Sequence, residues 1–105
     1  MEATQISDVM DAQSGSGKPY YEFLRHASMS LGLYVLPAGG EDTQQPHNED
    51  EVYVVLSGEG HVFVGGEEQA VTEGSIIFVP KRVEHYFHSI EEELRLLVFF
   101  APAES

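Results

Sequence analysis

Short apolar runs, separated by turns rich in glycine and proline, cover most of the chain after residue 19. Within the run Ser28–Leu36, the residues Leu31, Leu33 and Val35 alternate with other residues, which is typical of a β-strand. About nine such runs and no convincing helix indicate an all-β barrel or sandwich. The other expected strands are Tyr20–Arg25, Thr43–His47, Glu51–Leu56, His61–Val64, Gln69–Thr72, Ser75–Val79, Glu84–His88 and Leu94–Phe100.

The turns and the N-terminal residues divide the chain further. Ser57-Gly58-Glu59-Gly60 and the Gly65-Gly66 pair have the residues that tight hairpins need. Residues 1–18 are polar, apart from a short helical turn at Ile6–Asp11, and residues 14–17 form a Ser-Gly linker. We therefore expect a flexible N-terminal arm over residues 1–18 and a single barrel domain over residues 19–105.

Three of the expected strands are apolar on both faces, namely Val52–Leu56, Ile76–Val79 and Leu94–Phe100. In a barrel one face of each strand looks inward, and the other should be exposed to water. Apolar residues on both faces therefore imply that an outer sheet or a second subunit covers the outer face. This surplus predicts a homodimer.

The charge balance is one-sided, with 18 acidic and 5 basic residues and a net charge of −13. Such a charge repels phosphate backbones and anionic lipid surfaces, so we expect neither nucleic acid nor a membrane as partner. The chain has no cysteine, which removes disulfides and thiolate metal sites and suits the cytoplasm. We expect a cytoplasmic location, because no apolar run resembles a signal peptide or membrane span.

The segment Gln45–Glu51, read together with His85, offers two imidazoles, a carboxylate and an amide, all suited to one divalent metal. On one straight strand His47 and Glu51 would lie roughly 13 Å apart, at ~3.3 Å per residue, and could not share an ion. The residues between them favour turns, so the chain should reverse there and bring the two side chains together. Gln45 precedes His47 by two positions and should project from the same face.

Other histidines and aromatic residues carry weaker signals. His88 has the opposite strand parity from His85, so we interpret it as a structural or surface residue, and His61 as a half-exposed residue at a strand end. Aromatic residues in strands belong more often to the core than to a binding pocket. The candidate pocket walls are Tyr53, Val55, Phe63, Phe78 and Phe87.

Two stretches of the chain resemble the two motifs of small single-domain cupins. The first motif is a glycine, five residues, His-x-His, three or four residues, Glu, six residues and a glycine. Here Gly39 and Gly58 enclose Gln45-Pro46-His47 and Glu51 at that spacing. The resemblance spans about Leu31 to Pro102 and implies a cupin-type jelly-roll β-barrel, also called a double-stranded β-helix.

The second motif is a glycine, five residues, Pro-x-Gly, two residues, His, three residues and Asn. Here Gly74, Pro80 and His85 stand at the matching positions, whereas Arg82 replaces the glycine and Ser89 the asparagine. The resemblance implies that His47, Glu51 and His85 are metal ligands. Gln45 stands where the family usually has its first ligand histidine. It either ligates the metal, hydrogen-bonds a bound water, or leaves a coordination position open.

The resemblance to cupin dioxygenases implies a metal-dependent oxidoreductase that acts on a small organic substrate inside the barrel. The ion would be Fe, Mn, Ni or Zn, and Glu51 would be a catalytic proton acceptor if it can leave the metal. Two alternatives stay open, since the same ligands serve other chemistry. One is a metal-assisted isomerase or lyase, and the other is a cupin that binds a small ligand without catalysis.

Overall fold

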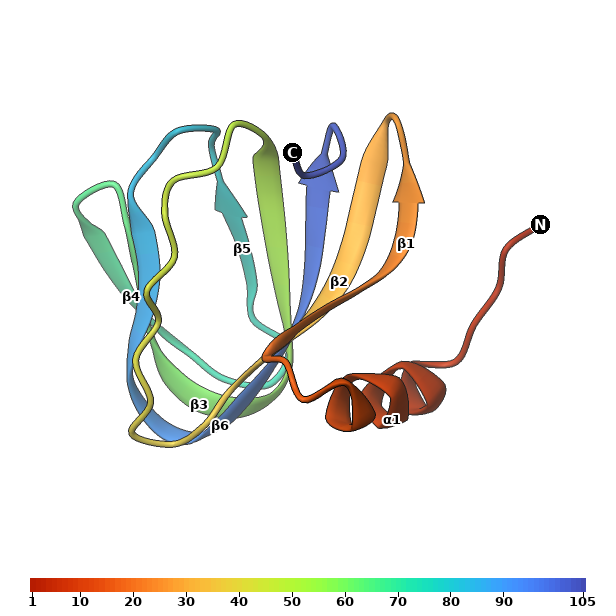
Figure 1. The fold of residues 1–105 in the computed structure, drawn as a ribbon. Helices are drawn as coiled ribbons and strands as arrows, with labels where there is room; N and C mark the ends of the chain where they lie inside the picture. The colour runs from red at the N-terminus through yellow and green to blue at the C-terminus, as the bar shows by residue number, and fades with distance from the viewer.

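The computed structural model describes residues 1–105, and six strands form one antiparallel sheet that curls into a barrel (Figure 1). The hydrogen-bonded order is β1-β2-β6-β3-β4, and β5 pairs with β3 alone. This architecture confirms the all-β class. The elements are α1 (Ile6–Ser16), β1 (Tyr20–His26), β2 (Met29–Leu36), β3 (Asp50–Val64), β4 (Glu67–Val71), β5 (Ile76–Val79) and β6 (His85–Ala101).

The strands are fewer and longer than the sequence predicts, because β3 and β6 each join two of the expected strands. The hairpin expected at Ser57–Gly60 is wrong: β3 runs through this segment, and its pairing with β6 shifts register there. Gly58 takes a positive φ of 104°, and a side chain on it would collide with the Glu93 carbonyl. Glycine therefore allows a β-bulge at this point. The bulge bends both long strands instead of reversing the chain.

The Gly65-Gly66 hairpin is confirmed and joins β3 to β4. Both glycines have positive φ values, 53° and 90°. A two-residue turn whose central residues both have positive φ matches the right-handed twist of its strands.

Two of the three departures from the cupin motifs fall on residues with strained backbones. Arg82 has a φ of 62° and Ser89 a φ of 50°, both in the left-handed region. Glycine and asparagine enter this region at lower cost than arginine and serine. The glycine and asparagine of the family motifs would therefore suit the backbone here better than Arg82 and Ser89 do.

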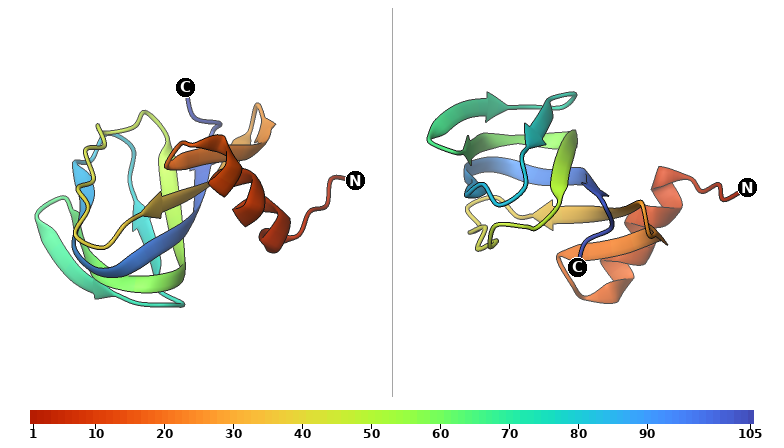
Figure 2. Two further views of the ribbon diagram at one scale, coloured as in Figure 1. Left: turned by 60° about the horizontal axis from the view of Figure 1, so that its bottom comes forward. Right: turned by 90° about the horizontal axis from the view of Figure 1, so that it is seen from above.

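The N-terminal segment contains a helix longer than expected. Helix α1 covers Ile6–Ser16, so residues 14–16 are helical and the expected linker over residues 14–17 is wrong there. The helix ends at Gly17, whose left-handed φ of 70° is usual at a helix C-terminus. The buried Val9 anchors α1, which lies on the side of β1 and β2 (Figure 2). Its length and polarity fall short of a membrane span. The division into an arm and a barrel domain stays a prediction.

The connection between β2 and β3 has no regular strand, although a strand was expected at Thr43–His47. This correction matters for the site, because the period-two alternation of a strand does not apply to residues 37–49. The barrel interior, in contrast, follows the alternation closely. Its buried apolar residues include Leu36, Tyr53, Val55, Val62, Val71, Val79, Phe87, Ile90, Leu94, Leu96, Val98 and Phe100.

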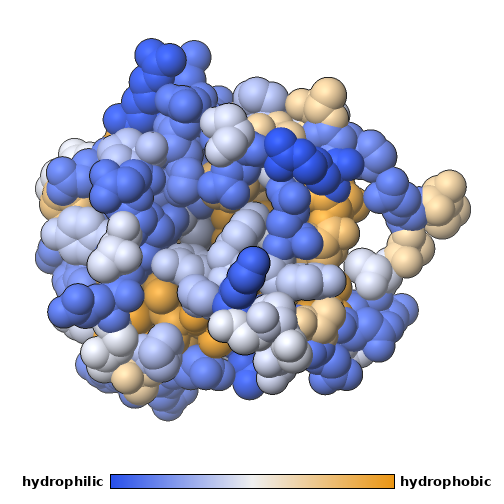
Figure 3. Space-filling model, in the orientation of Figure 1, coloured by the Kyte–Doolittle hydropathy of each residue, from blue (hydrophilic) through white to orange (hydrophobic).

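The outer face of the sheet is also apolar across four strands. One cross-strand row runs Leu31, Phe99, Val52 and Phe78, and the next runs Leu33, Leu97, Val54 and Ile76. Helix α1 lies near β2, whereas at the β5 end Ile76 is 72% exposed and Phe78 58% exposed. On the face that Figure 3 shows, by comparison, hydrophilic side chains cover most of the surface and hydrophobic ones are visible in recesses between them.

Candidate metal centre

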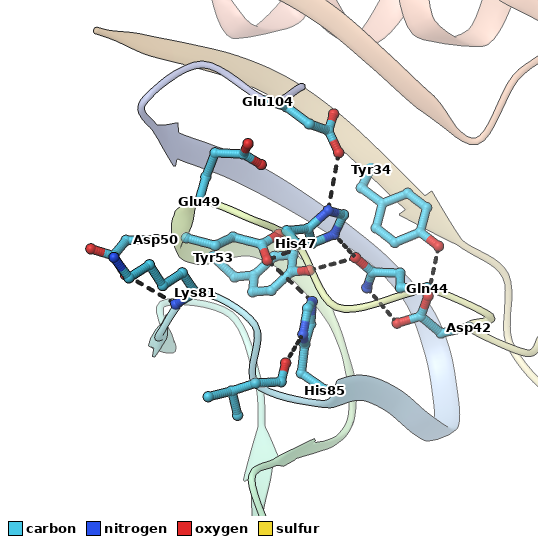
Figure 4. A network of polar contacts seen from close by, with 12 residues as sticks. Tyr34, Asp42, Gln44, His47, Glu49, Asp50, Tyr53, Lys81, His85 and Glu104 are labelled. Atoms are coloured by element: carbon cyan, nitrogen blue, oxygen red, sulfur yellow. Dashed lines mark hydrogen bonds and ion pairs between the residues drawn. The ribbon is translucent and has the colours of Figure 1, made fainter.

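The three proposed ligands come from three different parts of the chain. Glu51 lies near the start of β3, His85 is the first residue of β6, and His47 lies in the irregular connection before β3. The Arg82 N–H donates to the His47 carbonyl at 2.6 Å, so the turn before β6 fixes the backbone of His47. The Lys81 N–H donates to Asp50 Oδ1 at 3.0 Å, which ties the same turn to the start of β3 (Figure 4).

The structure brings His47, Glu51 and His85 together in one cluster. One potential ligand atom from each lies within 4.8 Å of the other two. Glu51 Oε1 is 3.1 Å from His85 Nε2 and 4.0 Å from His47 Nε2. The Glu51 and His85 side chains are 1% exposed, and that of His47 is 19% exposed. The geometry supports the grouping that the motif spacing predicts.

The buried polar atoms of the cluster lack hydrogen-bond partners. Both carboxylate oxygens of Glu51 and the Nε2 atom of His85 are buried without one. The 3.1 Å approach between them is an ion-pair distance whose angles do not make a hydrogen bond. Unsatisfied buried carboxylates are costly and call for an explanation. Two imidazole nitrogens and a carboxylate suit Fe, Mn, Ni or Zn, so the residues present fit a divalent ion.

The orientation of the His85 ring also fits a metal ligand. Its Nδ1 atom lies 2.9 Å from the Val83 carbonyl, to which it can donate a proton. That hydrogen bond leaves Nε2 as the free donor atom facing Glu51, which is the arrangement usual for metal-ligating histidines. Burial lowers the pKa of His85, but the Glu51 carboxylate and the Val83 carbonyl outweigh it, so the pKa of His85 is raised above its ordinary value.

The amide at the site comes from Gln44 and not from Gln45. The Gln45 side chain is exposed, whereas Gln44 Oε1 lies 3.2 Å from His47 Nε2. The prediction for Gln45 assumed a regular strand, in which residues two apart share a face. Because residues 43–47 are irregular, that parity fails and the neighbouring glutamine turns inward.

A network of hydrogen bonds fixes the Gln44 amide (Figure 4). Its Nε2 donates to Asp42 Oδ2 at 2.7 Å, and its Oε1 accepts from the Tyr53 hydroxyl at 2.8 Å. Asp42 also accepts from the Tyr34 hydroxyl at 2.7 Å and from the Phe87 N–H at 2.9 Å. These contacts aim the amide oxygen at His47. The sequence gives no pattern by which this network could be found, because the segment lacks periodicity.

The tyrosines around the cluster are held neutral. Burial raises the pKa of Tyr53, and the Glu51 carboxylate raises it further. Burial also raises the pKa of Tyr20, and the pKa of Tyr34 rises through burial and its bond to Asp42. Neutral phenols can donate hydrogen bonds, so these residues present apolar rings with polar tips.

A cavity of about 270 Å³ opens beside the cluster. Of the candidate pocket walls only Tyr53 lines it, whereas Val55 and Phe87 belong to the core and Phe78 is exposed. Sequence reasoning missed the phenols of Tyr20 and Tyr34, and also Glu104, the residue before the last. The lining residues are Pro19, Tyr20, Tyr34, Gln44, His47, Glu51, Tyr53, Val98, Phe100 and Glu104.

His61 and His88 lie together away from this cluster. They face each other across β3 and β6, with ring centroids 5.6 Å apart. His88 Nε2 is 3.2 Å from Glu68 Oε1. Strand parity therefore assigned His88 correctly to the face opposite His85.

Comparisons with known proteins place these features in a family. The family model described as "Cupin domain" matches residues 32–100, which include all three proposed ligands. An uncharacterized protein of Streptomyces coelicolor is 45% identical over 105 residues, which cover 100% of both chains.

Solved structures extend the comparison to the fold. A structure from Thermus thermophilus has a TM-score of 0.74 and 26% identity, with 98% of this chain and 99% of that chain covered. An RmlC-like cupin from Shewanella frigidimarina has a TM-score of 0.72 and 26% identity, with 80% and 75% covered. The first of these similarities extends over nearly the whole of both chains.

Proposed function

Because this chain belongs to the cupin family, we propose that it is a metal-dependent enzyme acting on a small organic molecule held in the barrel. Membership of the family confirms the jelly-roll β-barrel that the motifs predict. The observation that carries the proposal is the convergence of His47, Glu51 and His85, with buried and unpartnered polar atoms, beside a cavity lined by aromatic rings.

In this proposal His47 and His85 each offer Nε2, and Glu51 offers a carboxylate oxygen, to Fe, Mn, Ni or Zn. When bound, the ion supplies Lewis-acid or redox chemistry to a substrate at its open positions. Two imidazoles and one carboxylate are the ligand set of non-haem iron oxygenases, so our leading candidate is a dioxygenase-like oxidoreductase.

The chain's own residues bind and orient the substrate. The rings of Tyr20, Tyr34 and Phe100 line the cavity and give it an apolar wall beside the cluster. The cavity volume, about 270 Å³, lies near the lower end of small-molecule sites, which favours a substrate of one ring or a short chain. Glu51 has two oxygens without hydrogen-bond partners, so one of them can accept a substrate proton.

A second candidate is a metal-assisted isomerase or lyase, and Glu104 favours it. Its carboxylate lines the cavity together with Glu51, so two carboxylates border the substrate space. A pair of carboxylates can take a proton from one atom of a substrate and return it to another without any oxidation. The third possibility, a cupin that binds a small ligand without catalysis, is an outcome of the test below.

The test begins with the metal content of protein purified without added metal. The proposal predicts about one ion per chain, lost in the double variant His47→Ala/His85→Ala and kept in the control His61→Ala/His88→Ala. Oxygen uptake with small phenols or thiols supports the dioxygenase, and turnover with Zn²⁺ under anaerobic conditions supports the isomerase or lyase. Metal-free protein with full activity would contradict both, and ligand binding without turnover would indicate a binding protein.

The expected cytoplasmic location stays a prediction, which fractionation of cells that produce the chain would check. The expected absence of nucleic-acid and membrane partners is likewise a prediction. Its basis is the net charge of −13, which disfavours polyanionic surfaces.

A further inference from the structure

We propose that Glu104 is a positioning residue of the metal centre, which holds the His47 ring so that Nε2 faces Glu51. The C-terminal tail, residues 102–105, carries this carboxylate to the site. The inference rests on the proposed metal centre and goes beyond the ligands that the cupin motifs supply.

The tail is fixed along the hairpin between β1 and β2. The Glu104 N–H donates to Ser30 Oγ at 3.0 Å, and Ser30 is fully buried. Arg25 Nη2 donates to the Glu104 carbonyl at 2.8 Å, and the Ala103 N–H donates to the Ala27 carbonyl at 3.4 Å. These bonds fix the backbone on both sides of the Glu104 side chain, so its direction is set by the hairpin.

A further bond ties the tail to the connection that carries His47. The Ser105 N–H donates to Glu49 Oε2 at 3.3 Å, and Glu49 is only 5% exposed although it carries a carboxylate. The tail therefore bridges the β1–β2 hairpin and the segment just before β3. Its position brings Glu104 into the wall of the cavity.

The Glu104 side chain meets His47 on the ring edge opposite the other ligands. Glu104 Oε2 lies 3.3 Å from His47 Nδ1 (Figure 4). The ring of Phe100 packs edge-on against the same imidazole, with centroids 4.9 Å apart. His47 lies outside any strand, so β-pairing does not fix its backbone. The contacts with Glu104 and Phe100 therefore determine the orientation of its ring. His85, by contrast, has a carbonyl acceptor close by in its own turn.

A histidine that binds metal through Nε2 must carry its proton on Nδ1. Gln44 Oε1, which lies 3.2 Å from His47 Nε2, favours a proton on the wrong nitrogen. The Glu104 carboxylate, 3.3 Å from Nδ1, opposes this preference, because its negative charge favours a proton on that nitrogen. Removing the carboxylate partner of a ligating histidine typically costs about 10–100-fold in metal affinity.

The test is the affinity of metal-free protein for Zn²⁺, measured by calorimetric titration. For Glu104→Ala we expect the Kd to rise about 10–100-fold. The Kd of Glu104→Gln should rise less, because an amide oxygen can still accept a hydrogen bond. Glu68→Ala is the matched control, since Glu68 Oε1 lies 3.2 Å from His88 Nε2, at a similar distance but away from the cavity. The Kd of this variant should stay unchanged.

A second readout separates positioning from a general loss of structure. Nitrogen-15 NMR of metal-free protein at alkaline pH, where imidazole is neutral, reports the His47 tautomer. Glu104→Ala should move the proton from Nδ1 toward Nε2, and Glu68→Ala should leave it in place. If Glu104→Ala does not fold, Glu104→Gln decides by the same two readouts.

The outcomes distinguish this inference from the proposed function. Tight Zn²⁺ binding by the parent protein, with no loss in Glu104→Ala and no change of tautomer, would overturn the role of Glu104 and leave the metal centre standing. Absence of Zn²⁺ binding by the parent protein would overturn the metal centre and this inference with it.

Discussion

Glu51 Oε1 and His85 Nε2 lie 3.1 Å apart inside the barrel, although the two residues stand at opposite ends of the β3–β6 ladder. In the β3–β6 ladder Glu51 faces Phe100, whereas His85 faces Val64. The two long strands form a ribbon that folds over on itself, and its two ends close the site (Figure 1). The curvature of the barrel is therefore what turns a distant pair of residues into neighbours.

This relationship predicts an effect of Glu51→Gln whose sign depends on pH. In metal-free protein at alkaline pH, His85 is neutral and the variant removes a buried charge, so the free energy of unfolding should rise by about 1–3 kcal/mol. At acidic pH, His85 is charged and the variant removes its counter-ion, so stability should fall. Denaturant unfolding at both pH values measures this, and a loss of stability at both would contradict it.

The raised pKa of His85 predicts how metal binding depends on pH. Metal binding requires neutral imidazole. As the pH is lowered from alkaline values, the metal affinity should therefore begin to fall before the pH reaches 6.5, the ordinary pKa of histidine. In metal-free protein the same shift stabilises the fold fully below the unfolded pKa, and this contribution is lost as the pH rises through the folded value. Titrations of Zn²⁺ across this range test it. Affinity that stays flat from neutrality to about pH 5 would exclude histidine ligands.

Gln44 and Gln45 offer an internal control, because they are adjacent in sequence and differ in burial. Gln44→Leu leaves the Tyr53 hydroxyl without its acceptor and frees Asp42 from one donor, so it should cost about 1–3 kcal/mol in the free energy of unfolding. Gln45→Leu should change it by less than about 0.5 kcal/mol. Thermal unfolding measures both, and equal effects would show that the Gln44 network is not formed.

We propose that a second copy of the chain covers the outer apolar face. Ile76 and Phe78 end the two apolar rows at β5, and none of the eight row residues carries a charge in a chain of net charge −13. The two rows themselves therefore bring no carboxylates face to face when two copies meet there, although Glu67 and Glu68 lie at their border. The parent protein should have the mass of a dimer in solution, and Ile76→Glu/Phe78→Glu that of a monomer with unchanged metal affinity. A monomeric parent protein at working concentration would exclude the dimer.

The three proposed ligands could be found from the sequence because the spacing of the two cupin motifs marks all of them. This spacing identified His47 as well, although it lies outside any strand. Gln44 could not be found, since residues 37–49 have no periodicity from which to infer a direction. Glu104 lies in a tail whose place depends on contacts with β1 and β2. Gly58 was assigned to a hairpin because bulges and hairpins use the same residue types.

The most direct measurement is anomalous diffraction at the absorption edge of the metal, from crystals of protein loaded with Zn²⁺ or Mn²⁺. The account predicts one strong peak per chain, about 2.0–2.2 Å from His47 Nε2, His85 Nε2 and a Glu51 oxygen. No peak at that position in crystals soaked at saturating metal, or a peak bound by other side chains, would contradict it.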